Sequence, residues 1–292
     1  MSATSSNHLL VPPRQGLLAA LRNSLSRDEF FAGLYILGCA NGLGTNMIRA
    51  VNAGDWTGGT QNISVIVLFA CFAGISLLLR DKNEEIRAAD LLVAVAFLVG
   101  IAVPVSEMNW AAVTALSFYI LLFANNGGSR RRGALILLAL TVPLLWSRLL
   151  FAFFAKIFLE IDASFVAWLL GTPRTGNIIG LADGSGTMVI LPACSSLANM
   201  SLAFLCWVAV SQWVDHRSSR QDFLWCFLAC ASVVAVNVAR IAIMGLSHWH
   251  YMTFHYGWGA TTANAIILFL TIGFTALGCR RELFSSAKFS HA

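Results

Sequence analysis

The sequence predicts an all-α polytopic membrane protein with about eight transmembrane helices. Of its 292 residues, 58% are hydrophobic and only 11% are charged, whereas soluble domains carry about 25% charged residues. This composition argues against a water-soluble globule, a disordered chain and a nucleic-acid-binding protein, although the net charge is +5. In a membrane protein such a surplus of Lys and Arg reflects the charge of the cytoplasmic loops. We therefore expect membrane lipid, and no nucleic acid, as a partner of the chain.

A helix needs roughly 20 mostly apolar residues to cross the hydrocarbon core of a bilayer. Eight segments approach this requirement, although the third and fourth are short. They are Phe30–Ile48, Ile63–Leu79, Leu91–Val105, Trp110–Ala124, Ala134–Phe158, Ser195–Val214, Phe223–Ser247 and Ala260–Cys279. Pro143 predicts a kink in the fifth segment. Because helices satisfy their own backbone hydrogen bonds in lipid, we expect residues 30–279 to form one integral membrane bundle.

The positive charges predict the orientation of this bundle. The segments between successive spans fall into two sets, one on each side of the membrane. Fourteen Lys and Arg lie in the first set, which consists of the two ends of the chain and the loops at 80–90, 125–133 and 215–222. The opposite set holds only Arg49 and Arg174. The positive-inside rule then places both termini in the cytoplasm. Residues 1–29 are expected to be an uncleaved cytoplasmic tail, since no long apolar region with a small-residue cleavage site follows their arginines. Residues 280–292 would form the second tail.

One outer connection, residues 159–193, is much longer than the others. Its first part, Leu159–Leu170, mixes acidic and apolar residues, which is typical of a short helix lying in the membrane interface. Further on, two β-prone runs flank Asp183-Gly184-Ser185-Gly186, and this pattern predicts a small extracytoplasmic β-hairpin before the sixth helix. A long loop with secondary structure of its own indicates a functional role.

Cys194 is the first residue that indicates chemistry. The other six cysteines fall within predicted spans, where they serve as small apolar packing residues, whereas Cys194 lies at the outer mouth of the sixth span. We expect it in the first turn of that helix, where the helix dipole lowers the pKa of a thiol. The alternative is an inert interfacial cysteine.

Arg240 lies far along the seventh span, in the outer leaflet of the predicted bundle. An arginine within a transmembrane helix is costly and indicates a functional site by default, although snorkelling to the headgroups is the alternative. Asn237 precedes it by three residues and so shares its helical face.

Three histidines, His248, His250 and His255, occur in the outer loop between spans seven and eight. Each alone is typical of an ordinary interfacial histidine. His255, directly before the eighth span, is the one best placed to act as a general acid or base. Three successive spans would therefore bring a thiol, a guanidinium and an imidazole to the same outer depth. Cysteine with histidine forms a nucleophile and its base, and an adjacent arginine stabilises an oxyanion.

At these residues the sequence resembles the exosortase and archaeosortase family of membrane cysteine transpeptidases. The resemblance covers mainly residues 130–280, with the catalytic core at about 130–279. It depends on Ala193-Cys194-Ser195-Ser196-Leu197, on Asn237-Val238-Ala239-Arg240-Ile241, on His255 with Gly259, and on the preceding Arg174-Thr175-Gly176-Asn177-Ile178. Ser196 departs from the family, which usually has glycine there.

The resemblance implies an enzyme that cleaves C-terminal sorting signals of exported proteins at the outer face of the bacterial cytoplasmic (inner) membrane. Such a PEP-CTERM-like signal has a short motif such as Pro-Glu-Pro, a transmembrane helix and a basic tail, and the new C-terminus passes to an acceptor through a thioester. By resemblance, Cys194 is the nucleophile, His255 the general acid and base, and Arg240 the positioner or oxyanion stabiliser. Asn237, Ser195 and Arg174 are the expected supporting or substrate-binding residues, and no metal or organic cofactor is implied.

Three other functions compete with this one. Arg148 and Lys156, on the fifth span, could bind an anionic headgroup in a transporter or lipid-binding bundle. The spacing His248-x-His250-x₄-His255 offers three ligands to a metal-dependent hydrolase, but it lacks the helical H-E-x-x-H pattern and a nearby acid. Asp183-Gly184-Ser185-Gly186 fits a turn better than the nucleophile motif of a serine protease.

Overall fold

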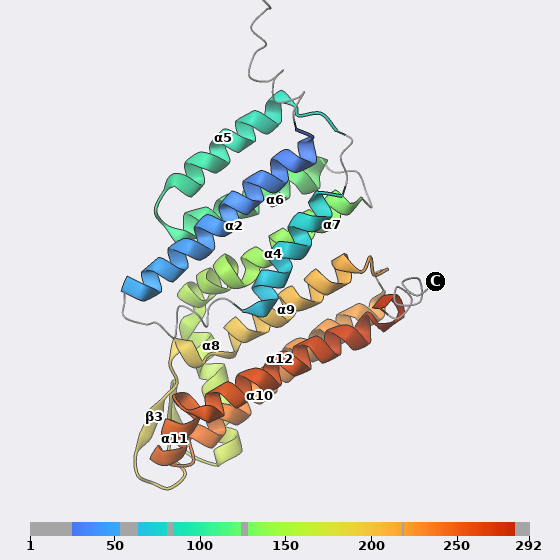
Figure 1. Cartoon of the computed structure of the whole chain (residues 1–292). Coiled ribbons are helices and arrows are strands. Elements are labelled where there is room, and N and C mark those ends of the chain that lie inside the picture. Colours follow the sequence, from blue (N-terminus) through green and yellow to red (C-terminus); the bar gives the residue numbers. More distant parts are fainter. Residues whose placement is uncertain (1–24, 53–63, 81–83, 124–127, 218, 284–292) are drawn as a thin grey trace, which may run out of the picture.

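The computed structural model describes residues 25–52, 64–80, 84–123, 128–217 and 219–283. These ranges contain ten α-helices and one small β-sheet (Figure 1). The helices are α2 (Arg27–Asn52), α4 (Val65–Leu78), α5 (Ala88–Ala102), α6 (Ser106–Phe123), α7 (Ser129–Thr141), α8 (Ser147–Leu170), α9 (Ser196–Trp213), α10 (Arg220–Met244), α11 (His248–His255) and α12 (Trp258–Gly278).

Three helical stretches in the described residues are long and apolar enough to cross a membrane: Ser129–Leu170, Arg220–Met244 and Trp258–Gly278. Val65–Leu78 and Ala88–Ala102 are apolar but shorter. The protein is thus a helical membrane protein, whereas the number of eight spans and their orientation stay predictions. Most of the expected tail at 1–29 and the end of the tail at 280–292 lie outside the described residues.

The fifth predicted span differs from expectation. It does not end near Phe158, because α7, a π-helical turn at Val142–Trp146 and α8 form one stretch of 42 residues from Ser129 to Leu170. The expected separate interfacial helix at Leu159–Leu170 is therefore wrong: this segment is the last part of α8. The π-helical turn contains Pro143, so the predicted local distortion is confirmed, and a second kink lies at Phe154. Gly171, with φ of 65°, ends the helix in a left-handed conformation that favours glycine.

The predicted hairpin is present and has one additional strand. β2 (Ile178–Gly180) and β3 (Thr187–Val189) pair antiparallel around the turn that contains Asp183, and β1 (Arg174–Thr175) pairs with the other edge of β2. Ser185 donates to the Asp183 carboxylate through both its backbone N–H and its hydroxyl. The turn function assigned to this motif is thereby confirmed.

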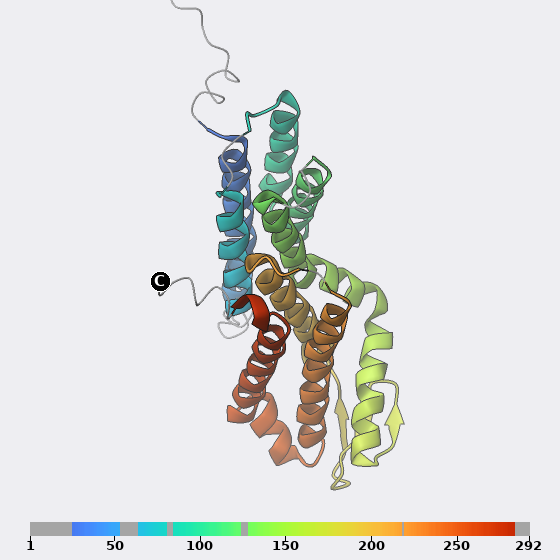
Figure 2. The same cartoon turned by 90° about the vertical axis from the view of Figure 1, so that its right-hand side faces the viewer.

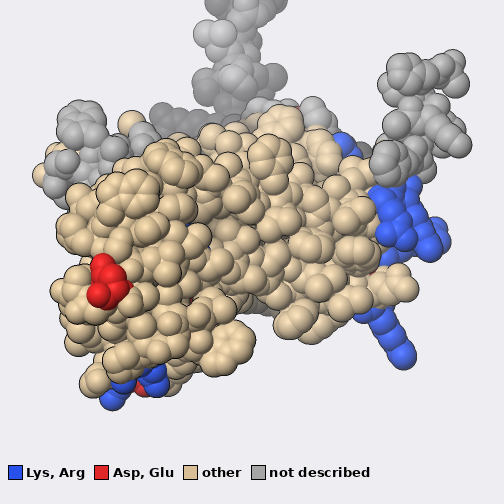
Figure 3. All heavy atoms as spheres, turned by 90° about the horizontal axis from the view of Figure 1, so that it is seen from below, with Lys and Arg blue, Asp and Glu red and all other residues tan. Residues whose placement is uncertain are grey.

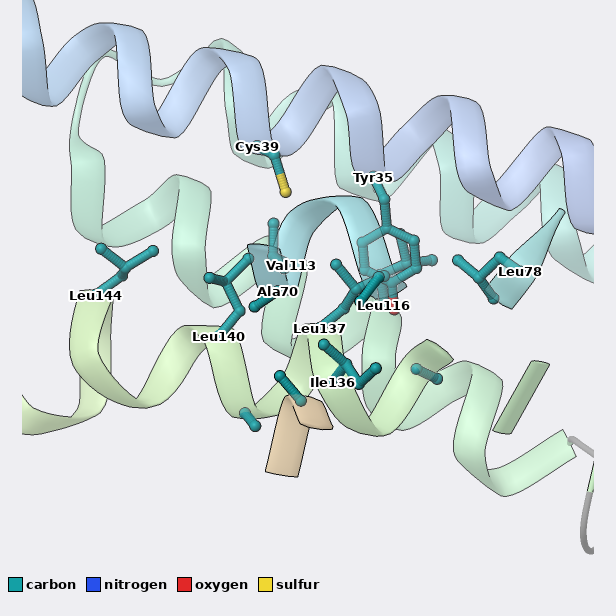
Figure 4. Close-up of a cluster of buried hydrophobic side chains, with 14 of the residues drawn as sticks. Tyr35, Cys39, Ala70, Leu78, Val113, Leu116, Ile136, Leu137, Leu140 and Leu144 are labelled. Atoms are coloured by element: carbon teal, nitrogen blue, oxygen red, sulfur yellow. The ribbon is translucent and has the colours of Figure 1, made fainter. Parts of the chain in front are cut away.

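The helices of the first part of the chain form a core to which α9 also contributes. Side chains of α2, α4, α6 and α7 interdigitate there, among them Tyr35, Ala70, Leu116 and Leu137 (Figure 4). At one end of this core Arg27 binds the Asp90 carboxylate through two nitrogens, at 2.8 and 2.9 Å. Both side chains are buried, so this pair joins α2 to α5 away from water.

The second part of the chain carries the site. In Figure 2, α8, α10 and α12 stand in a row with α10 in contact with both neighbours. α9 packs on α10 and α12 on one side and on α4 and α7 on the other, so it connects the two parts. Seen from the end that bears the sheet and α11, uncharged side chains cover most of the molecule and charged ones are confined to a few places (Figure 3).

Candidate active site

Cys194 ends a short 3₁₀ turn, Pro192–Cys194, which follows β3. Ser195 is the N-cap of α9, and its hydroxyl accepts a hydrogen bond from the backbone N–H of Leu197. The thiol thus lies one residue before the N-cap and not within the first helical turn, which corrects the sequence-based expectation. Its residue is buried, with 6% of its surface exposed.

The backbone around the nucleophile has its N–H groups committed to internal acceptors. Cys194 donates to the Leu191 carbonyl at 2.9 Å, and Ser195 donates to the Pro192 carbonyl at 3.1 Å. The N–H of Ser196 binds an Asp162 carboxylate oxygen at 3.1 Å. These bonds hold the turn rigidly, and they mean that an oxyanion formed at Cys194 needs a side-chain donor.

His255 places an imidazole nitrogen beside the sulfur. Its Nε2 lies 3.8 Å from Sγ of Cys194, within hydrogen-bonding distance for sulfur. The Tyr251 and Tyr256 rings flank the imidazole, with centroids at 5.0 and 4.3 Å. Its other ring nitrogen, Nδ1, is buried and has no hydrogen-bond partner among the described residues. Aromatic packing therefore orients this imidazole.

Arg240 approaches the same pair from α10. Its Nε donates to the carbonyl oxygen of Phe254 at 3.1 Å, and its charge acts on both Cys194 and His255. Nε is the only nitrogen of this guanidinium with a hydrogen-bond acceptor in the described part of the chain. Its terminal nitrogens can thus serve as the side-chain donors that the backbone does not provide.

Burial determines the protonation of the site. It raises the pKa of the Cys194 thiol, and the attraction of the Arg240 charge offsets this only in part. Burial, together with repulsion from Arg240, lowers the pKa of the His255 imidazole. The expected lowering of the thiol pKa is therefore wrong, because burial raises this pKa overall. At neutral pH the resting pair is a neutral thiol beside a neutral imidazole.

A buried polar network supports the nucleophile from behind. The amide of Asn237 donates to the carbonyl oxygen of Cys194 at 2.7 Å and to the Ser196 hydroxyl at 3.0 Å. The Ser196 hydroxyl in turn donates to the Asp162 carboxylate at 2.9 Å. All three side chains are buried. Ser196 thus links Asn237 of α10 to Asp162 of α8.

Asp162 was not predicted as a site residue. Its mixed acidic and apolar surroundings indicated the polar side of an interfacial helix, but it lies on the buried face of α8 with Leu159, Ala163 and Val166. The sequence could have placed Asp162 on this face, because Asp162 and the three apolar residues recur at the intervals of three and four that mark one side of a helix. Which backbone N–H groups it would bind could not be read from that spacing.

The remaining predicted residues have other contacts. Ser195 caps α9. The Arg174 side chain is exposed on β1, and its guanidinium binds the Gly176 carbonyl at 2.7 Å, so the structure does not bring it to the thiol. His250 Nδ1 is 2.8 Å from the Ser247 hydroxyl, and His248 stacks with Tyr251. Within the ranges described, no three His, Cys, Asp or Glu side chains are grouped to hold a metal ion.

Comparison with known proteins assigns the chain to a family. No curated protein and no solved structure matches the chain. Residues 55–277, more than half of the sequence, match the family described as transmembrane exosortase. This range includes the thiol, the imidazole, the guanidinium and the network behind them. The chain belongs to the transmembrane exosortase family.

Proposed function

We propose that this protein is a membrane cysteine transpeptidase that cleaves C-terminal sorting signals of exported proteins. The observation that carries the proposal is the contact of 3.8 Å between Cys194 Sγ and His255 Nε2, beside the charge of Arg240. A thiol and an imidazole at hydrogen-bonding distance are the minimum for nucleophilic acyl transfer. Family membership supports the reaction class.

The first half-reaction begins with the neutral pair. His255 Nε2 accepts the thiol proton as Sγ attacks the carbonyl carbon of the scissile bond, and the carbonyl electrons move onto its oxygen. The terminal nitrogens of Arg240 stabilise that oxyanion. When the oxyanion collapses, the C–N bond breaks, His255 protonates the leaving amine, and a thioester remains on Cys194.

The second half-reaction regenerates the enzyme. An acceptor nucleophile gives its proton to His255 and attacks the thioester carbonyl. Collapse of this second oxyanion breaks the C–S bond, and the proton returns from Nε2 to the sulfur. The residues of the site account for every proton transfer without a cofactor.

The substrate and the location follow from the resemblance and the charge pattern. The substrate would present a short motif, a transmembrane helix and a basic tail. The reaction would take place at the outer face of a bacterial cytoplasmic membrane, since the arginine-rich connections are assigned to the cytoplasm.

The test is cleavage of a secreted reporter that ends in such a signal, in cells that contain the full-length protein. We expect Cys194→Ala, His255→Ala and Arg240→Ala to leave the reporter uncut, and hydroxylamine to release a hydroxamate of the shortened reporter from the wild-type enzyme. Cys226→Ala on α10 and His250→Ala are matched controls that should cleave normally. Normal processing by Cys194→Ala would refute the proposal.

A further inference from the structure

β3 (Thr187–Val189) is an edge strand of the small sheet. The strand order is β1-β2-β3, so β2 pairs with one side of β3, and no strand in the described part of the chain pairs with the other side. The chain continues from β3 through Ile190 and Leu191 into the short turn that holds Cys194. The unpaired side of this strand therefore leads directly to the candidate active site.

The register shows which backbone groups of β3 face away from β2. Ile190 donates its N–H to the carbonyl of Asn177, the residue before β2, at 2.9 Å. Backbone groups alternate between the two sides of a strand in an antiparallel pair, so Met188 also faces β2. The N–H and C=O groups of Thr187 and Val189 consequently point outward, and no backbone hydrogen bond among the described residues uses them.

The residues of this edge favour pairing with a further strand. Sheet edges are commonly protected by charged side chains or by proline, but residues 187–191 include neither. Thr187 and Val189 are β-branched, which favours extended structure. Val189 and Leu191 are each 47% exposed, whereas Met188 and Ile190 are buried in the core. The buried side chains hold the strand in place, and its outer edge is available for a partner.

α11 lies beside β3 (Figure 1), and a groove of about 270 Å³ separates the two elements. Val189 and Leu191 are among the residues that line the groove from the strand, and His248 and Tyr251 line it from α11. The ring of Tyr251 also packs against His255, with a centroid distance of 5.0 Å. The groove along the strand therefore adjoins the catalytic imidazole.

We propose that the outer edge of β3 binds the segment of the substrate that precedes the scissile bond, as a fourth strand of the sheet. The inference depends on the proposed function, because it takes the occupant to be the peptide that Cys194 attacks. An extended peptide carries N–H and C=O groups at the same spacing as the outward groups of Thr187 and Val189. Alternate side chains of the added strand enter the groove beside Tyr251, which gives the groove a role in specificity.

The position of the nucleophile determines the direction of the added strand. β3 runs toward Cys194, which follows Val189 by five residues, and the segment before the scissile bond also runs toward the sulfur. The two strands are therefore parallel. In such a pair Val189 donates its N–H to one peptide carbonyl and accepts an N–H from the peptide residue two positions further on. The segment after the scissile bond does not compete for this edge, because the helix that it forms in the proposed substrate satisfies its own backbone.

The experiment measures how fast a peptide probe labels Cys194 in the full-length protein in lipid nanodiscs. The probe is acetyl-hexaalanine chloromethyl ketone. Sγ of Cys194 displaces its chloride and forms a thioether, His255 accepts the thiol proton, and intact-mass spectrometry counts the product over time. In further probes each alanine in turn is replaced by N-methylalanine. Because the N–H groups of a strand face its two sides alternately, we expect the methyl group to slow labelling by about tenfold at every second position and by about twofold at most between them.

A variant of the strand tests the protein side of the pairing. Val189→Pro removes an N–H that β2 does not use, and proline is tolerated at such edge positions. We expect labelling by the hexaalanine probe to slow by about fivefold, whereas alkylation of Cys194 by iodoacetamide, which is too small to pair with β3, stays within about twofold. Val189→Thr, which keeps both the N–H and the β-branched shape, is the matched control and should react like the wild type.

The failures of the two proposals are distinguishable. If no peptide probe labels Cys194 in the wild type, the proposed function itself fails. If labelling occurs but N-methylation has the same effect at every position, or no effect at any, the added strand alone is refuted. If Val189→Pro converts a dimer to a monomer in size-exclusion chromatography and leaves peptide labelling unchanged, the edge joins two copies of the chain and the inference is wrong.

Discussion

The side-chain amide of Asn237 donates a hydrogen bond of 2.7 Å to the backbone carbonyl of Cys194. It thereby connects the last third of α10 to the turn that holds the nucleophile, 43 residues earlier in the chain. Buried polar groups that lose such a partner cost about 1–3 kcal/mol each. The position of the sulfur thus depends on a side chain that takes no part in the chemistry.

Replacement of Asn237 by leucine should therefore misplace the nucleophile. We expect cleavage of the reporter to fall by about tenfold to a hundredfold, because small errors of position are costly in catalysis. Ser232→Ala is the matched control, since its hydroxyl donates to the Ala229 carbonyl within the same helix. Comparison of kcat with KM separates the outcomes: a change in KM alone would contradict a positioning role for Asn237.

Asp162 and Ser196 should behave as one unit. Asp162→Ala removes the acceptor of both the backbone N–H and the hydroxyl of Ser196, which should lower the free energy of unfolding by about 1–3 kcal/mol and slow cleavage. Glu160→Gln, on the same helix but partly exposed, should change little.

A double-mutant cycle then tests the coupling within this pair. Ser196→Gly and Asp162→Ala should be non-additive because they remove the same hydrogen bond. Strictly additive effects on the melting temperature would show that the two side chains act separately.

The sequence predicted part of this site and missed part of it, for physical reasons. Cys194, Arg240 and His255 could be placed together because each lies toward the same end of a strongly apolar helix, and hydropathy locates such ends. The bonds of Asp162 could not be predicted, since they join segments 34 residues apart through tertiary packing. The thiol pKa was mispredicted because the helix dipole is visible in the sequence, whereas burial is visible only in the fold.

The fold, too, was predicted where local residues determine it and missed where tertiary packing does. The hairpin was predicted from its turn residues, because Asp183 and Gly184 act locally. The end of the fifth span was misplaced, since Glu160 and Asp162 lowered the apolar character of a helix that continues to Leu170. Asp162 is compatible with that helix because its carboxylate has found buried donors.

The pH dependence of cleavage should show the lowered pKa of His255. Only the neutral imidazole accepts the thiol proton, and a lowered pKa keeps it neutral in more acidic solution. The acid limb of kcat/KM should then lie below about pH 6.5, the ordinary value for histidine. Arg240→Gln removes the repulsion that contributes to this shift, so the limb of its residual activity should move to higher pH.

The pH dependence of thiol alkylation tests the electrostatics of the same site independently. Its raised pKa predicts that alkylation by iodoacetamide continues to accelerate above about pH 8.5, where an ordinary cysteine is half ionised. Arg240→Gln should shift this profile further upward, since the guanidinium attracts the thiolate. A shift of either profile in the opposite direction would contradict the electrostatic role of Arg240.

The ion pair between Arg27 and Asp90 should stabilise the protein without affecting catalysis directly. Asp90→Asn removes a negative charge that pairs with the buried guanidinium of Arg27. Breaking a buried ion pair in this way typically costs about 3–5 kcal/mol of stability, although Glu84, at 2.7 Å from Arg27, retains part of the pairing. Thermal unfolding in detergent should show a clear loss of stability. Arg49→Gln, which removes an exposed pair, should cost at most about 1 kcal/mol, and an equal loss in both variants would contradict the importance of burial.

The bond from Arg240 to the carbonyl of Phe254 has a mechanical consequence. Phe254 is the direct covalent neighbour of His255, so the base and the cation are tied to one peptide unit. A displacement of α11 therefore acts on the imidazole directly and on the guanidinium through this bond. Loss of the bond would free the cation from the base while leaving it attached to α10.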